Sequence, residues 1–213
     1  VFDGSSDISS HLEHGTWMAR TIYEIAPEAE LFMAKVFDDS GVAYASDVLA
    51  GLEWCESQNP DIISLSIGGG LFEGICVEDP VAQKVTELFN SGIVVIASSG
   101  NDGSPVAMTS PACAEKVIAV GSSVGNESIS SFSNRNDALD LLAPGGGVFV
   151  EDSLGENIYL SGTSVSAAIV AGGSVLVLEN KTVSPIELED GLRASGNIIE
   201  KYPFVQFDNY LNG

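Results

Sequence analysis

Three polar side chains in separate parts of the sequence are of the types that together hydrolyse acyl bonds: Ser164, His14 and Asn101. Ser164 lies between Thr163 and a run of small apolar residues, a pattern typical of the first turn of a buried helix. Free backbone N–H groups and the helix dipole favour negative charge there, which suits a nucleophile whose attack creates an oxyanion. Serine is also a common helix N-cap, so this segment alone leaves a capping role and a catalytic role equally open.

His14 and Asn101 are the residues that could complete such a site. Histidine titrates near neutral pH and is the usual general base for a serine hydroxyl. Asn101 follows the apolar, β-branched residues 93–96, which predict a buried parallel strand. Open α/β sheets bind ligands at the carboxyl ends of such strands, where an asparagine amide can donate a hydrogen bond to an oxyanion.

The elements that must position these residues alternate between strands and helices. Apolar runs predict strands at residues 31–36, 62–66 and 93–96. Helical spacing of apolar residues predicts helices at 46–56, 80–90 and 186–194, besides the helix around Ser164. This alternation predicts an α/β fold in which a mainly parallel, doubly wound sheet lies between helices on both faces.

The segments around His14, Asn101 and Ser164, in this order, resemble the subtilisin-like serine proteases. Residues 61–69, 110–112, 117–121, 132–133 and 142–145 resemble the same family. The resemblance implies a three-layer fold and a serine endopeptidase that needs no cofactor for its chemistry. It implies that Ser164 is the nucleophile and His14 the general base, and that Asn101 and the Ser164 backbone N–H form the oxyanion hole.

The resemblance also implies a site for a polypeptide substrate. Ser66, Ile67 and Gly68 would form the strand that pairs with the substrate backbone. Ser98, Ser99 and Gly100 would form the opposite wall of the primary specificity pocket, with Thr109 near its floor. All of the pocket residues are small and uncharged, so we expect the pocket to accept an apolar or uncharged side chain.

The three cysteines bear on the compartment. In many secreted bacterial members of the family, cysteines at the places of Cys76 and Cys113 form a disulfide, and the same bridge is expected here in a secreted or extracellular protein. The alternative is two free buried thiols in a cytosolic protein. Cys55 is expected to be a reduced core residue. Where the chain has Ser110–Pro111, the family carries a cis peptide bond, which we also expect here.

One part of the family pattern is not recognisable in this sequence. The third catalytic residue is an Asp at the end of a strand that reads roughly Val-Ala-Val-Ile-Asp-Thr-Gly, upstream of the histidine. Asp3 and Asp7 are acids in a short polar stretch, where carboxylates are usually solvated. We therefore expect residues 1–213 to be an N-terminally incomplete catalytic domain, completed by an N-terminal segment that carries the Asp strand. The alternative is a catalytically weak pseudoprotease, a peptide-binding module on the same scaffold.

Composition excludes several other classes of protein. The 213 residues are 45% hydrophobic and 18% charged, which excludes a disordered chain. Thirty acidic and eight basic residues give a net charge of −22, which disfavours a nucleic-acid partner. No membrane span, nucleotide-binding glycine motif or calcium-binding loop is recognisable. His11 and His14 alone are weak evidence for zinc, so no metal site is predicted.

Overall fold

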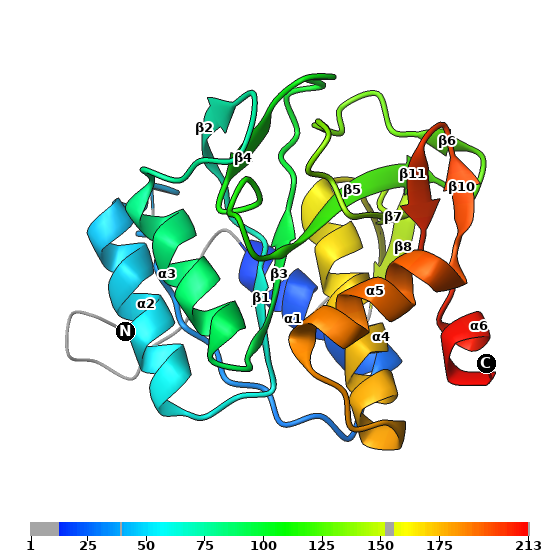
Figure 1. Ribbon diagram of the computed structural model, residues 1–213, viewed down its shortest axis with the longest axis horizontal. Helices are drawn as coiled ribbons and strands as arrows, with labels where there is room; N and C mark the ends of the chain where they lie inside the picture. The colour runs from blue at the N-terminus through cyan, green and yellow to red at the C-terminus, as the bar shows by residue number, and fades with distance from the viewer. Residues whose placement is uncertain (1–12, 39, 152–155, 213) are drawn as a thin grey trace.

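The computed structural model describes residues 13–38, 40–151 and 156–212 and has three layers, a central sheet between two layers of helices (Figure 1). The sheet contains, in spatial order, β1 (Ile62–Leu65), β3 (Val94–Ser98), β5 (Ile118–Val124), β7 (Leu141–Pro144), β11 (Tyr202–Phe204) and β10 (Asn197–Ile199). The first five strands are parallel, β10 is antiparallel to β11, and β6 (Ser128–Ile129) is antiparallel to β5. The predicted fold class is therefore confirmed.

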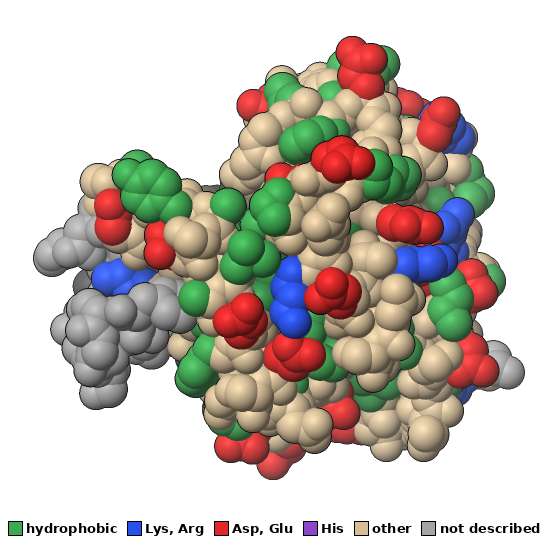
Figure 2. All heavy atoms as spheres, turned by 60° about the vertical axis from the view of Figure 1, so that its left-hand side comes forward, with side chains coloured by type: hydrophobic (Ala, Val, Ile, Leu, Met, Phe, Trp, Pro, Cys, Tyr) green, Lys and Arg blue, Asp and Glu red, His purple; other side chains and the backbone are tan. Residues whose placement is uncertain are grey.

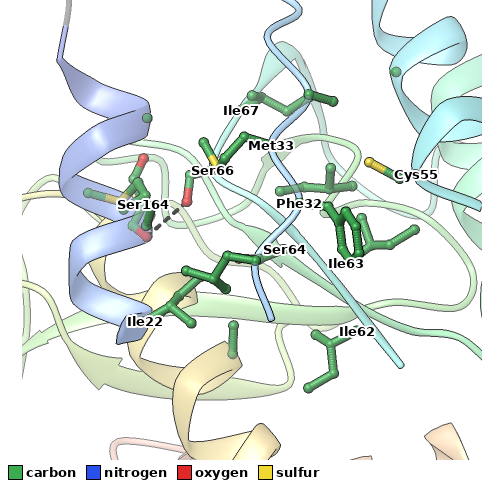
Figure 3. A pocket seen from close by; sticks show the side chains of 18 of the residues that line it. Ile22, Phe32, Met33, Cys55, Ile62, Ile63, Ser64, Ser66, Ile67 and Ser164 are labelled. Atoms are coloured by element: carbon green, nitrogen blue, oxygen red, sulfur yellow. Dashed lines mark hydrogen bonds between the residues drawn. The ribbon is translucent and has the colours of Figure 1, made fainter. Parts of the chain in front are cut away.

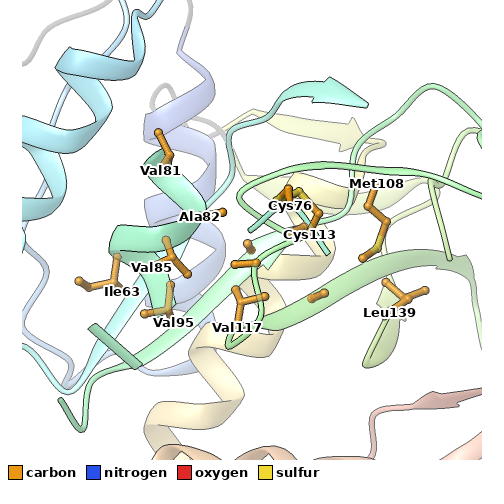
Figure 4. Close-up of a cluster of buried hydrophobic side chains, with 14 of the residues drawn as sticks. Ile63, Cys76, Val81, Ala82, Val85, Val95, Met108, Cys113, Val117 and Leu139 are labelled. Atoms are coloured by element: carbon orange, nitrogen blue, oxygen red, sulfur yellow. A yellow bond between two sulfur atoms is a disulfide. The ribbon is translucent and has the colours of Figure 1, made fainter. Parts of the chain in front are cut away.

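Successive side chains of each strand point to opposite sides of the sheet, and both sides are apolar. Val95 and Ala97 of β3 point into one core cluster, and Val94 and Ile96 point into the other. Helices α2 (Ala45–Ser57) and α3 (Pro80–Asn90) cover the first face, and α4 (Thr163–Asn180) and α5 (Pro185–Ser195) cover the second. Figure 4 shows the first cluster, in which side chains of α3 lie over Ile63 and Val95.

Local capping signals set where α3 and α5 begin. The Asp79 side chain accepts a hydrogen bond from the Ala82 N–H, and Pro80 occupies the first turn of α3. At α5, Ser184 and Glu187 form a capping box, again with a proline in the first turn. The helices predicted at 80–90 and 186–194 are confirmed, as is the one at 46–56, which α2 contains.

Helices α1 (His14–Ile25) and α4 lie side by side and run in the same direction. Met18 of α1 packs with Val165 and Ala168, and further along a Cβ added to Gly172 would lie 2.9 Å from the Cβ of Ile25. The close approach explains why small residues occupy α4. This helix is long and apolar enough to cross a membrane by length and composition, but it is mostly buried, as expected of a core helix.

Two antiparallel strand pairs and a short helix complete the described chain. β2 (Gly69–Phe72) pairs with β4 (Met108–Ser110), and β8 (Val148–Glu151) pairs with β9 (Asn157–Leu160). α6 (Phe207–Asn212) follows β11. The Cys76–Cys113 disulfide and the cis Ser110–Pro111 bond are both present, so these two predictions are confirmed.

The strand predicted at residues 31–36 is wrong, because the structure gives this segment no regular secondary structure. A strand needs a hydrogen-bonded neighbour, and within the described ranges no strand lies beside this segment. The nearby edge of the sheet is β1, which pairs on one side with β3 and, among the residues that the structure describes, has no paired strand on its other side. The strands predicted at 62–66 and 93–96 correspond to β1 and β3.

Candidate active site

The first turns of α1 and α4 lie at the same end of the helix pair. His14 is the first residue of α1, one turn before Met18, and Ser164 directly precedes Val165, a neighbour of Met18 in the same apolar cluster. Parallel packing of the two helices therefore places both side chains at one end, where both line a single cavity of about 1290 Å³. The candidate base and the candidate nucleophile, 150 residues apart in the sequence, thus line one cavity.

Asn101 reaches this cavity from the carboxyl end of β3. Its Oδ1 atom accepts two hydrogen bonds from Thr163, at 2.9 Å from the backbone N and at 3.0 Å from Oγ1. Thr163 Oγ1 in turn accepts from the Gly100 N–H at 3.2 Å. Because Oδ1 is taken by these donors, the Nδ2 amide hydrogens of Asn101 are left for a group in the cavity.

The segment after β1 forms a second wall of the cavity, which Ser66, Ile67 and Gly68 line. The Ser66 hydroxyl donates to the Ser164 carbonyl at 3.0 Å, which joins this segment to the start of α4 (Figure 3). Gly68 lies so close to Thr109 that an added Cβ would stand 2.5 Å from the threonine Oγ1. The sequence-predicted substrate strand therefore lies beside the candidate nucleophile.

Three of the four predicted pocket residues line the cavity, and the fourth lies behind its wall. Ser98, Gly100 and Thr109 line it, and all are small and uncharged. Ser99 is fully buried, and its hydroxyl donates to the Asn134 carbonyl at 2.8 Å. Ser99 thus supports the wall from behind.

Burial lowers the pKa of His14. Its imidazole stays accessible to solvent, while the cavity walls remove part of its hydration and so disfavour the charged form. A described carboxyl group beside the ring would raise the pKa, and none contributes. Asp3, Asp7 and His11 lie outside the described residues.

The cavity continues away from Ser164 along the unpaired edge of β1. Ile62, Ile63 and Ser64 of β1 line one side, and Phe32 and Met33 of the extended segment 29–37 line the other (Figure 3). Cys55 of α2 also lines it and is half-buried, so this free thiol borders the cavity as well as the core. Burial raises the pKa of the Cys55 thiol.

Within the described ranges, no group of three or more His, Cys, Asp or Glu side chains is placed to hold a metal ion. Two contacts of the site were not anticipated by sequence reasoning. Thr163 fixes the Asn101 amide, and Asn134 binds the loop that carries it. Asn134 follows residues 132–133, which carry part of the family resemblance, but local sequence gives no sign that its side chain turns toward a loop thirty residues away.

Comparison with known proteins supplies independent information. The sequence profile of the Subtilase family matches residues 2–195. Subtilisin DY of Bacillus licheniformis is 32% identical over 197 residues, which are 85% of this chain and 69% of that protein. Subtilisin E of Bacillus subtilis (strain 168) is 33% identical over 212 residues, 92% of this chain and 52% of that protein. The chain thus spans about half to two thirds of the length of these relatives.

Solved structures agree with these matches. A cold adapted subtilisin-like serine proteinase has a TM-score of 0.75 and 30% identity, and the match covers 88% of this chain and 69% of that one. A lanthipeptide protease has a TM-score of 0.84 at 20% identity, covering 99% of this chain and 79% of that one, which supports the fold alone.

Proposed function

Because this chain belongs to the subtilase family, we propose that it is a serine endopeptidase that cleaves peptide bonds through an acyl-enzyme on Ser164. In the proposed reaction His14 accepts the Ser164 hydroxyl proton as the oxygen attacks the scissile carbonyl carbon. Asn101 Nδ2 and the Ser164 backbone N–H donate to the oxyanion. His14 then protonates the leaving amine, and water attacks the ester by the same route in reverse.

The observation that carries this proposal is the convergence of three elements on one cavity. His14 begins α1, Ser164 lies in the first turn of α4, and Asn101 follows β3. The fixed Asn101 amide strengthens it, because a preorganised donor stabilises developing charge without reorganisation.

The unpaired edge of β1 supports an acid supplied by a further strand. A strand placed between β1 and residues 29–37 would pair with the β1 backbone and cover Ile62, Ile63 and Phe32, which line the cavity there. If it runs parallel to β1, its carboxyl end lies at the His14 end of the cavity. We therefore propose that an N-terminal segment of the same domain fills this space and presents an Asp to His14.

The proposed substrate is a polypeptide bound in extended form. Residues 66–68 would pair with its backbone, and Ser98, Gly100 and Thr109 give the neighbouring pocket no charge. The pocket would therefore take an apolar or uncharged side chain. Cleavage of a mixed peptide library checks this, and a strict preference for Arg or Lys would contradict it.

The buried Cys76–Cys113 disulfide supports a secreted or extracellular location, because such bonds persist in oxidising compartments. The acidic composition adds no support for a nucleic-acid partner.

A second candidate function is peptide binding by a weak pseudoprotease, which is favoured because no carboxyl group of the described residues raises the pKa of His14. Loss of the acid lowered kcat by about 3 × 10⁴-fold where it was measured, in a subtilisin. A fluorophosphonate probe separates the candidates. Rapid modification of Ser164, abolished by Ser164→Ala, supports the enzyme, and an inert but folded protein supports the binder.

The acid itself is tested with a synthetic Val-Ala-Val-Ile-Asp-Thr-Gly peptide and a matched peptide that carries Asn in place of Asp. Both should protect Cys55 from a thiol reagent, since both fill the cavity that Cys55 lines. Only the Asp peptide should accelerate labelling of Ser164. Equal acceleration by both peptides would contradict a catalytic role for the acid.

A further inference from the structure

The loop at residues 100–104 carries Asn101 and is held by the side chain of a residue outside the cavity lining. Asn134 is fully buried, and its Oδ1 atom accepts from the Asp102 N–H at 3.0 Å and from the Ser104 N–H at 2.9 Å. Its Nδ2 atom donates to Asp102 Oδ2 at 2.9 Å. One amide group thus binds three atoms of a single loop, on the carboxyl side of Asn101.

The backbone around Asn134 binds the same loop. The Asn134 N–H donates to the Gly100 carbonyl at 3.0 Å, and the Gly103 N–H donates to the Phe132 carbonyl at 2.7 Å. The Arg135 N–H donates to the Ser104 carbonyl at 2.8 Å. Asn101 is therefore bracketed by hydrogen bonds to residues 132–135 on both sides.

Gly100 shows how closely the loop fits this segment. Its φ of 105° lies in the region that favours glycine, and an added Cβ would stand 2.3 Å from Asn134 Nδ2. The backbone of the loop is thus fixed against Asn134, while Thr163 fixes the Asn101 side chain from the opposite direction.

We infer that Asn134 is a positioning residue for the oxyanion hole: its side chain fixes the loop that aims Asn101 Nδ2 at the reacting carbonyl. The inference rests on the proposed function for its catalytic meaning. Asn134 is not among the residues that line the cavity, and it acts through the loop that carries Asn101. Displacement of a catalytic donor by about 1 Å can lower a rate by about 10²-fold, so a loosened loop has a measurable effect.

A charge swap tests this inference. Asn134→Asp keeps an oxygen for the Asp102 and Ser104 N–H groups but opposes the Asp102 carboxyl group with a second one. Labelling of Ser164 by a fluorophosphonate should slow by roughly 10- to 100-fold. Adding Asp102→Asn restores a donor opposite the new carboxylate, and the double variant should label within about threefold of wild type. Asp102→Asn alone is the reference single variant: its effect on labelling is measured separately, so that the coupling between positions 102 and 134 can be calculated from the full double-mutant cycle.

A second comparison separates positioning from general destabilisation. In an Asn101→Ala background the donor is gone, so Asn134→Ala should slow labelling by no more than about twofold further. If Asn134→Ala slows labelling in this background as much as it does in the wild-type protein, or if Asn134→Asp labels like wild type, the inference is overturned. The inference is also overturned if the double variant, Asn134→Asp with Asp102→Asn, is folded but labels as slowly as Asn134→Asp alone.

Hydrogen exchange gives a readout that does not need activity. The backbone amides of Asp102 and Ser104 should exchange faster in Asn134→Asp than in wild type. Their exchange rates should return toward wild-type values in the double variant. Unchanged exchange overturns the inference. An inert wild-type Ser164 together with the expected exchange pattern would contradict the proposed function and leave the loop-fixing role supported.

Discussion

At the scale of single residues, His14 combines an accessible ring with a pKa lowered by burial. The imidazole should therefore remain neutral, and able to accept a proton, below the ordinary histidine value of about 6.5. We expect the acid limb of Ser164 labelling to lie below that pH, and a docked carboxylate to raise the pKa and move the limb upward. Proton NMR titration of the ring measures the pKa, with His11→Gln to assign the signal. A pKa at or above 6.5 without an added acid would contradict this expectation.

Asp140 is a second residue whose protonation is set by its surroundings. Burial raises its pKa to about 7, helped by the nearby Glu189 and opposed by the Ala119 N–H and Arg193. The pKa of Asp140 is higher in the folded protein than in the unfolded chain. Asp140 therefore contributes to the free energy of unfolding fully below about pH 4, and this contribution is lost as the pH rises through 7. Asp140→Asn should remove this dependence, on the order of 1–3 kcal/mol in the free energy of unfolding between pH 4 and 8.

Urea denaturation of wild type and variant across this range provides the measurement. Asp137→Asn is the control, because Asp137 is exposed and its hydrogen bond with Lys201 lowers the pKa of its carboxyl group. Parallel stability curves for wild type and Asp140→Asn would argue against a raised pKa in the folded protein.

At the scale of elements, the Cys76–Cys113 bond fixes the segment before α3 to the loop that follows β4. It closes a separation of 37 residues, both cysteines are buried, and the Cys76 N–H donates to the Cys113 carbonyl at 2.8 Å (Figure 4). Replacement of both by alanine should lower the free energy of unfolding by roughly 3–4 kcal/mol, because the unfolded chain regains loop entropy. Chemical denaturation measures the loss, and Cys55→Ala controls for loss of a thiol. A change below about 1 kcal/mol would count against this account.

At the scale of the whole molecule, acidic side chains spread over the surface with few basic ones between them, as Figure 2 shows for one face. A net charge of −22 means that self-repulsion opposes the compact state. Raising NaCl from 10 to about 300 mM shortens the Debye length below about 10 Å and should raise Tm. Differential scanning fluorimetry measures Tm, with equal osmolality of sucrose as the control. A Tm that falls or stays constant as NaCl rises would show that repulsion is not a significant term.

Local sequence determined the elements whose signals need no distant partner. The helix at 80–90 follows from Asp79, Pro80 and its apolar spacing, and the helix of α5 from Ser184 and Pro185. The strand at 93–96 follows from its β-branched run, because burial on both faces requires continuous apolar residues. Residues 31–36 have a comparable pattern yet form no strand, since pairing depends on a neighbour that local sequence does not specify.

Sequence by itself also determined which chemical groups the candidate site contains, because the residue types and the family resemblance identify Ser164, His14 and Asn101. Only the tertiary structure decided how they are held. The parallel packing of α1 and α4 places two of them at one end, and Thr163 and Asn134 fix the third through contacts that span 62 residues and 30–34 residues, respectively. Such contacts depend on strand order and helix packing, which bring together residues whose local sequences carry no record of each other.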